Sequence, residues 1–120
     1  MRFSIHEMSG EKYIRCVPSD EPICSERQAL DLLGACCEYD VGRIMLPDGA
    51  LGEAFFRLGT GVAGAILQKL TNYQTRVAIV IEDETAVKGK FREFITECNR
   101  GGGVHFFQNE EAAAVWLAGQ

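Results

Sequence analysis

The chain lacks the sequence features that mark nucleic-acid-binding and membrane proteins. Only 12 of its 120 residues are Lys or Arg, against 17 Asp or Glu, and one modest basic group is present at Lys88, Lys90 and Arg92. Phosphate-backbone binding depends on clustered basic side chains, so we expect no nucleic-acid partner. No apolar run approaches the ~20 residues of a membrane-spanning helix, so we expect no membrane partner either.

The cysteines do not form the pattern of a disulfide-stabilised secreted protein. They are odd in number and contain no C-x-x-C pair, and the N-terminus has no signal-peptide pattern. We therefore expect a cytoplasmic protein whose thiols stay reduced. The five are Cys16, Cys24, Cys36, Cys37 and Cys98.

The common catalytic combinations are also missing. The sequence has no Ser-His-Asp elbow, no Cys-His-Asp set and no paired catalytic carboxylates. His6 and His105 lie far apart without the spacing of metal ligands. We predict no catalytic residue, no bound metal and no cofactor, and the balance favours a protein that is not an enzyme.

What the chain does contain is typical of one globular domain. Its apolar fraction of 47% and charged fraction of 24% are average values, and 120 residues suit a single core. Periodicity predicts the order β-β-α-β-(α)-α-β-α-β-α, which is a single α/β domain over residues 1–120. We expect a mixed sheet of about five strands, formed by an N-terminal hairpin and parallel strands, with flanking helices. The predicted strands cover residues 2–7, 13–17, 41–46, 75–81 and 104–107.

The predicted helices have recognisable ends. Ser25 and Gln28 have the spacing of a capping box. One apolar face of the helix that follows contains Leu30, Leu33 and Cys37 and is extended by Ala29, Leu32 and Cys36. A short helical or irregular piece is expected at 51–57, and longer helices at 60–72 and 87–98. The three glycines at 101–103 are expected to end the last of these, and Asn109 to cap a final helix that docks through 115–117.

The most informative stretch is Arg57-Leu58-Gly59-Thr60-Gly61-Val62-Ala63-Gly64, which leads into the helix at 60–72. The hydroxyl of Thr60 is placed to cap the helix or to face a partner. Small residues leave the first backbone N–H groups open to an anion. The glycines fit G-x-G-x-x-G, but the loop does not directly follow a strand, so we interpret them as sites of tight helix packing.

This motif also carries a family resemblance. Residues 60–64, the helix residues 66–73 after them, and Asn99-Arg100-Gly101-Gly102 resemble an uncharacterised bacterial family, domain of unknown function 4180, over nearly the whole chain. The topology is also similar to the STAS domain of anti-sigma-factor antagonists. That resemblance implies phosphorylation by a partner kinase at the residue corresponding to Thr60, at the start of a central helix.

Acidic residues follow two of the predicted strands. Asp48 comes after the strand at 41–46, and Glu82, Asp83 and Glu84 come after the strand at 75–81. The carboxyl ends of strands form the functional edge of an open α/β sheet, and grouped carboxylates suit Mg²⁺. The favoured interpretation is a solvated acidic edge whose acids cap the next helix.

Two functions remain open from the sequence. The first is a regulatory or protein-interaction module whose site includes Asp48, Arg57, Gly59, Thr60 and Gly61, with Thr60 as a phosphorylation site. One aromatic of each of the pairs 55–56 and 106–107 would then be exposed for a partner. The alternative is a small-molecule or anion-binding protein that uses the same helix start with Glu82 and Asp83 opposite. A homodimer through a sheet edge is a third possibility.

Overall fold

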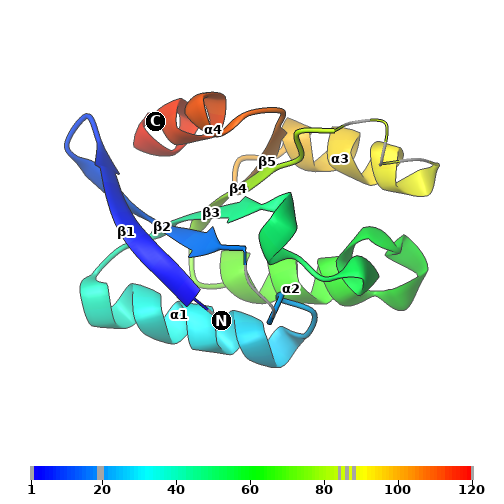
Figure 1. Ribbon diagram of the computed structural model, residues 1–120, viewed down its shortest axis with the longest axis horizontal. Coiled ribbons are helices and arrows are strands. Elements are labelled where there is room, and N and C mark those ends of the chain that lie inside the picture. The colour runs from blue at the N-terminus through cyan, green and yellow to red at the C-terminus, as the bar shows by residue number, and fades with distance from the viewer. Residues whose placement is uncertain (1, 19–20, 84, 86, 88, 120) are drawn as a thin grey trace.

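The computed structural model describes residues 2–18, 21–83, 85, 87 and 89–119, so Glu84 and Lys88 of the predicted groups lie outside the described residues. The chain forms a five-stranded sheet of order β1-β2-β3-β4-β5 with helices on both faces (Figure 1). The first two strands are antiparallel and the others are parallel. This confirms the predicted α/β class with a mixed sheet of five strands.

The N-terminal hairpin follows from its turn. Strands β1 (Arg2–Met8) and β2 (Glu11–Val17) pair over their full lengths. Ser9 and Gly10, which join them, both have positive φ, at 53° and 82°. Two such residues match the right-handed twist of the strands on either side. The predicted hairpin is confirmed, with both strands slightly longer than expected.

The parallel strands form the buried centre of the sheet. They are β3 (Arg43–Pro47), β4 (Arg76–Val80) and β5 (Val104–Phe107). In β4 the residues after Arg76 are all buried, which explains the nearly continuous apolar sequence of that strand. Its place between β3 and β5 confirms the prediction of an interior strand.

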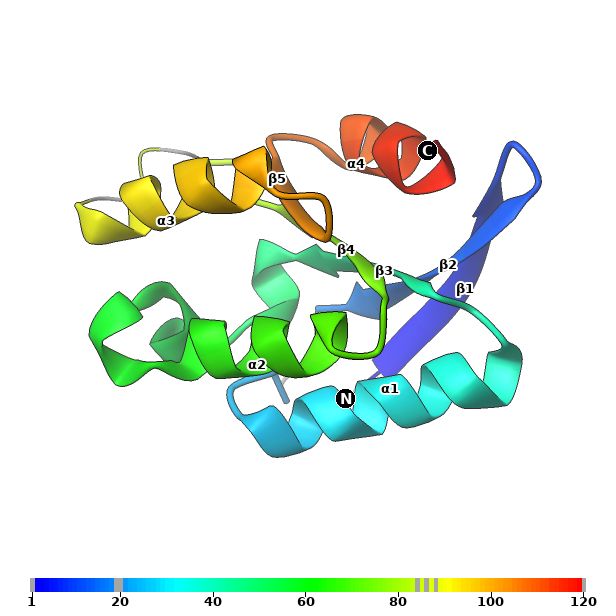
Figure 2. The same ribbon diagram turned by 180° about the vertical axis from the view of Figure 1, so that it is seen from behind.

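The helices divide unequally between the two faces. Helices α1 (Glu26–Tyr39) and α2 (Val62–Thr71) lie side by side on one face, and α4 (Glu110–Ala118) covers the other (Figures 1 and 2). Helix α3 (Lys90–Arg100) packs mainly on β5, and its apolar side joins the core beneath α1 and α2. In the described part of the chain, no helix is long and apolar enough to cross a membrane.

Polar contacts fix the start of α4. The side chain of Asn109 accepts a hydrogen bond from the N–H of Ala112 at 2.8 Å, as the sequence predicted. Arg15 of β2 donates through Nε and Nη2 to the two carboxylate oxygens of Glu110, at 2.8 and 2.9 Å. A bidentate pair of this kind fixes direction as well as distance. This pair therefore fixes the position of the first turn of α4 relative to β2.

Two arginines hold the other end of α4. Arg43 Nε donates to the carbonyl of Leu117 at 2.7 Å, and Arg76 Nη2 donates to that of Trp116 at 2.8 Å. The Arg76 guanidinium also lies 4.1 Å from the centroid of the Trp116 ring. Carbonyls at the C-terminus of a helix lack partners within the helix, so these arginines satisfy them and complement the helix dipole.

The structure corrects two expectations about α1. Ser25 precedes the helix as predicted, but its side chain makes no capping hydrogen bond. Gln28 reaches back instead to the N–H of Cys24, at 2.8 Å. The predicted apolar face is confirmed only in part: Ala29, Leu32, Leu33 and Cys36 are buried as expected, whereas Leu30 and Cys37 are exposed.

Three expectations about the later helices are also corrected. Helix α3 begins at Lys90, so Val87 is buried without being helical. The helix does end at the glycines 101–103, but the first of them is extended, with φ −84°, and none has a positive φ. In α4, Leu117 is fully buried whereas Val115 is exposed, because only one side of this short helix faces the sheet.

An aromatic cluster joins α3 to the segment before α2 and to β5. Its members have ring centroids 5.3–6.3 Å apart and form the wall of the core beside α3. Phe55 is fully buried and Phe56 is half-buried against Phe91, so neither is the exposed aromatic that we expected near Thr60. The cluster consists of Phe55, Phe56, Phe91, Phe94 and Phe106.

Candidate functional site

The predicted site residues follow strands at the carboxyl edge of the sheet. The segment after β3 contains three short 3₁₀ turns, Asp48–Ala50, Glu53–Phe56 and Leu58–Thr60, before α2 begins. In Figures 1 and 2 the last two of these turns lie beside α3. The segments after β4 and β5 leave the same edge, because these strands are parallel to β3. Open α/β sheets bind their ligands at such an edge.

Thr60 lies one residue further from the helix than we predicted. Helix α2 begins at Val62, and Gly61 is the residue before it, with φ 76°. The Thr60 side chain nevertheless reaches the helix, because its Oγ1 accepts a hydrogen bond from the N–H of Val62 at 3.2 Å. The same hydroxyl lies 2.8 Å from two carbonyl oxygens, those of Ala54 and Arg57, and its one hydrogen can be donated to either. Thr60 thus ties the turns to the start of α2 while remaining exposed.

The glycines near Thr60 are not there for internal packing. A Cβ atom added at Gly59, Gly61 or Gly64 would meet nothing within 4 Å outside its own neighbours. Gly61 has a conformational reason to be glycine, since its φ is in the left-handed region. Gly59 and Gly64 have neither a close packing contact nor a positive φ that would require glycine. The interpretation of the three as tight helix packing is therefore wrong, and the surface around Thr60 is left open.

The structure does not join all the predicted site residues. Arg57 is exposed and forms an ion pair with Glu53, four residues before it on the same surface. Asp48 lies in the first 3₁₀ turn and is half-buried. Among the described residues, no hydrogen bond or ion pair connects Asp48 to Arg57 or Thr60. The contacts therefore centre on Thr60 and the turns that it binds.

The acidic edge is a solvated turn. Glu82 and Asp83 are exposed, and Asp83 accepts hydrogen bonds from the backbone N–H and the hydroxyl of Thr85. These bonds hold the pKa of Asp83 below its usual value. The two described acids of this group, Glu82 and Asp83, do not cap α3, which begins only at Lys90. Within the described ranges, no three His, Cys, Asp or Glu side chains are grouped to hold a metal ion.

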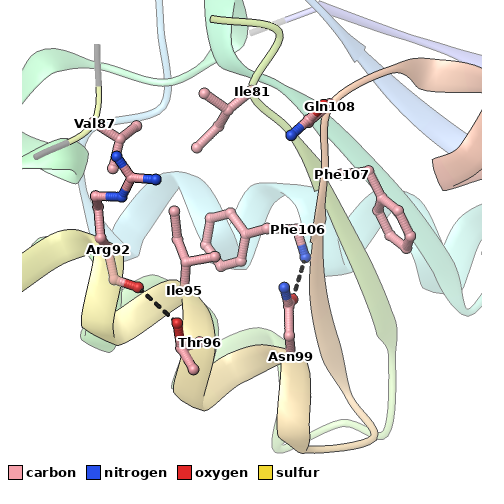
Figure 3. A pocket seen from close by; sticks show the side chains of 9 residues that line it. All are labelled: Ile81, Val87, Arg92, Ile95, Thr96, Asn99, Phe106, Phe107 and Gln108. Carbon is pink, nitrogen blue, oxygen red and sulfur yellow. Dashed lines mark hydrogen bonds between the residues drawn. The ribbon is translucent and has the colours of Figure 1, made fainter. Parts of the chain in front are cut away.

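Sequence reasoning missed a pocket at this edge of the sheet. It has a volume of about 410 Å³ and lies between α3 and the ends of β4 and β5 (Figure 3). The polar residues that line it include Arg92, Asn99 and Gln108. The isolated basic group that contains Arg92 and the family-like segment that begins at Asn99 were the available signals. Neither signal could show that Arg92 and Asn99 of α3 line the same pocket as Gln108, which follows β5.

The thiols differ in exposure and acidity. Burial raises the pKa of Cys16 to about 12 and that of Cys36 to about 11. Burial also raises the pKa of Cys98, which is partly exposed. Cys24 and Cys37 are exposed. None of the five is in a disulfide.

We expect iodoacetamide to modify Cys24 and Cys37 of the native protein long before Cys16. A thiolate is the reacting species, and a rise of the pKa to about 12 lowers its fraction near neutral pH by roughly a thousandfold relative to an ordinary thiol. Peptide mass spectrometry over a time course measures this directly, with unfolded protein as the control in which all five thiols react. Equal labelling of Cys16 and Cys37 in the native protein would contradict the buried position of Cys16.

Comparison with known proteins gives a family without a described activity. The model of the family described as Domain of unknown function (DUF4180) matches residues 8–117. No curated protein matches the chain, and no solved structure matches it. The predicted resemblance to this family is confirmed, whereas the similarity to STAS domains stays a prediction.

Proposed function

We propose a regulatory role in protein binding for this chain, which belongs to the family of domains of unknown function that its sequence matches. The proposed docking surface is the open region around Thr60, formed by residues 53–64, and a kinase switches it by phosphorylating Thr60. The observation that carries the proposal is Thr60, an exposed residue whose hydroxyl holds the turns to α2 through the carbonyls of Ala54 and Arg57 and the N–H of Val62. A group in that position is accessible to a kinase and structurally consequential.

Phosphorylation would break the contacts that the hydroxyl now makes. The kinase transfers a phosphoryl group from ATP to Oγ1, releasing ADP and the hydroxyl proton, so no hydrogen remains to donate to either carbonyl. The phosphate adds nearly two negative charges. Those charges repel the carbonyl oxygens of Ala54 and Arg57 and compete with Glu53 for the Arg57 guanidinium. The turns must therefore rearrange, which changes the surface that a partner meets.

The glycines support close approach by a partner. Glycine in a helix is less stable than alanine by about 0.5–1 kcal/mol, yet Gly64 lies in the first turn of α2 with open space around it. Among the described residues, no close contact explains why position 64 has no side chain. A partner whose backbone lies against this turn would explain it. The anion-binding alternative has less support, because Thr60 already occupies the first amide of the helix.

The proposal is tested first on protein isolated from its own cells. Phosphopeptide mass spectrometry over residues 58–69 should find phosphate on Thr60 under at least one growth condition. The binding of protein partners should then differ between two variants: Thr60→Glu, which cannot donate a hydrogen bond to the carbonyls, and Thr60→Ser, which keeps the hydroxyl. An unmodified Thr60 under all conditions, together with the same partners for both variants, would overturn the proposal.

Gly64→Ala gives an independent prediction. This change should raise the free energy of unfolding by about 0.5–1 kcal/mol, because alanine is the better helix former and its methyl group meets nothing. Gly61→Ala is the matched control and should lower it by about 1–2 kcal/mol, because its φ of 76° strains any residue with a Cβ. Urea unfolding measures both. If Gly64 serves a partner, the stabilised variant should also bind that partner more weakly than the wild type.

A further inference from the structure

The pocket between α3 and the ends of β4 and β5 has an apolar floor. Ile81, Ile95 and Phe106 point toward one another in Figure 3, from the end of β4, from α3 and from β5 respectively. Ile81 and Phe106 also belong to the main core, so this part of the pocket cannot move without disturbing the fold. A volume of about 410 Å³ is within the range of small-molecule sites.

Arg92, which lines this pocket, forms no ion pair with any residue that the structure describes. The guanidinium of Arg92 lies on the α3 side in Figure 3, with Gln108 on the other side. Among the described residues, no carboxylate lies within ion-pair distance of Arg92. Arg100, which is on the same helix but does not line the pocket, pairs with Glu97 at 3.4 Å. The positive charge beside the apolar floor is therefore available to a ligand.

The amide of Asn99 adds a donor with a fixed orientation. Its Oδ1 accepts a hydrogen bond from the N–H of Phe106 at 2.7 Å, which satisfies an amide on the outer edge of β5. Asn99 lines the pocket, and its Nδ2 forms no hydrogen bond with another described residue. The guanidinium of Arg92 and the Nδ2 of Asn99 are donors only, and the amide of Gln108 can donate as well as accept. Donors with one free positive charge suit an anion.

From these observations we infer that the pocket binds a small organic carboxylate with an apolar body. The apolar group lies against Ile81, Ile95 and Phe106, and the carboxylate pairs with the guanidinium of Arg92. A guanidinium can donate two parallel hydrogen bonds to one carboxylate, which favours this group over a neutral polar one. The inference does not depend on Thr60 or on its phosphorylation, since none of these residues belongs to the turns at 53–60.

The test compares an acid with its neutral amide. The ¹⁵N-labelled protein is titrated with phenylacetate and with phenylacetamide, and amide shifts are followed by NMR. Phenylacetate should shift the amides of Ile81, Ile95 and Gln108 and should bind more tightly than phenylacetamide. Arg92→Gln should weaken phenylacetate roughly tenfold and leave phenylacetamide unchanged, because only the acid pairs with the guanidinium. Arg100→Gln, the matched control on α3, should leave both affinities as they are.

Three results would overturn this inference. The first is the absence of shifts at the pocket with phenylacetate or with the branched acid 4-methylpentanoate at millimolar concentrations. The second is equal affinity for the acid and the amide, which would remove the role of the charge. The third is equal weakening by Arg92→Gln and Arg100→Gln, which would reduce the effect to the net charge of the protein. Arg92 is exposed, so its replacement should not unfold the domain.

Discussion

Replacing Phe91 with alanine is expected to lower the free energy of unfolding by about 3–5 kcal/mol. Phe91 is only 3% exposed, and its ring contacts four other aromatic rings, from the turn before α2, from α3 itself and from β5. Removing it leaves a cavity that no neighbour can fill without losing its own contacts. Domains of this kind are stable by only about 5–15 kcal/mol, so the loss is a large part of the total.

Urea unfolding of the wild type and the variant measures this loss. Phe94→Ala is the matched control: Phe94 lies on the same helix and contacts Phe91 and Phe106, but it is only partly buried. Phe94→Ala should lower the free energy of unfolding clearly less than Phe91→Ala does, because part of the Phe94 ring already faces water in the wild type. If the two variants were equally unstable, Phe91 would not be the centre of the cluster.

The same cluster connects the two candidate sites. Phe56 lies between Ala54 and Arg57, the two residues whose carbonyl oxygens contact the Thr60 hydroxyl. The centroid of its ring is 5.6 Å from that of Phe91. The Phe91 ring is in turn 6.1 Å from that of Phe106, which forms part of the pocket floor. Two ring contacts therefore link the turn at 53–56 to the pocket. Phe94→Ala keeps both of these contacts and removes only those of the Phe94 ring with Phe91 and Phe106.

The sequence predicted the elements whose signals are local. The Ser9-Gly10 turn, the Asn109 cap and the apolar run of β4 each depend on residues a few positions apart, and each is present in the structure. The order of the elements then limits the topology, because parallel strands need helical connections. A mixed sheet with flanking helices follows from these local facts.

Sequence reasoning failed where tertiary contacts decide. Leu30 fits the apolar period of α1, but of the predicted apolar residues only those nearer Ala29 and Leu32 are buried, and Leu30 is exposed. Gly64 fits a packing glycine, but a Cβ added there would have no contact within 4 Å among the described residues outside its own part of the helix. The pocket could not be predicted at all, because Arg92 and Gln108 are brought together only when α3 packs on β5. These features depend on how the helices pack on the sheet, which a local sequence pattern does not predict.

Leu117→Ala is expected to lower the free energy of unfolding by about 2–5 kcal/mol and to loosen α4 from the sheet. Leu117 is fully buried, and with Ala113 and Ala114 it forms the apolar side of α4 that meets Met45 and Val80. The alanines have little surface to bury and Trp116 is only partly buried against the cluster, so Leu117 is the large side chain of α4 that is fully buried there. Hydrogen exchange should show faster exchange in α4 of the variant than in its α1 or α2.

The competing explanation is that the ion pair between Arg15 and Glu110 holds α4. The Arg15 guanidinium lowers the pKa of Glu110, so the stability that the pair supplies is present above the usual pKa of a glutamate and is lost as the pH falls through the lowered value. The pair is partly exposed, and such pairs contribute at most about 1 kcal/mol. Glu110→Gln should therefore cost little near neutral pH, and nothing in acid where the wild-type carboxyl is protonated. The cost of Leu117→Ala should be nearly the same at both pH values, because apolar burial does not titrate. A loss in Glu110→Gln as large as that in Leu117→Ala would instead make the charge pair the main anchor of α4.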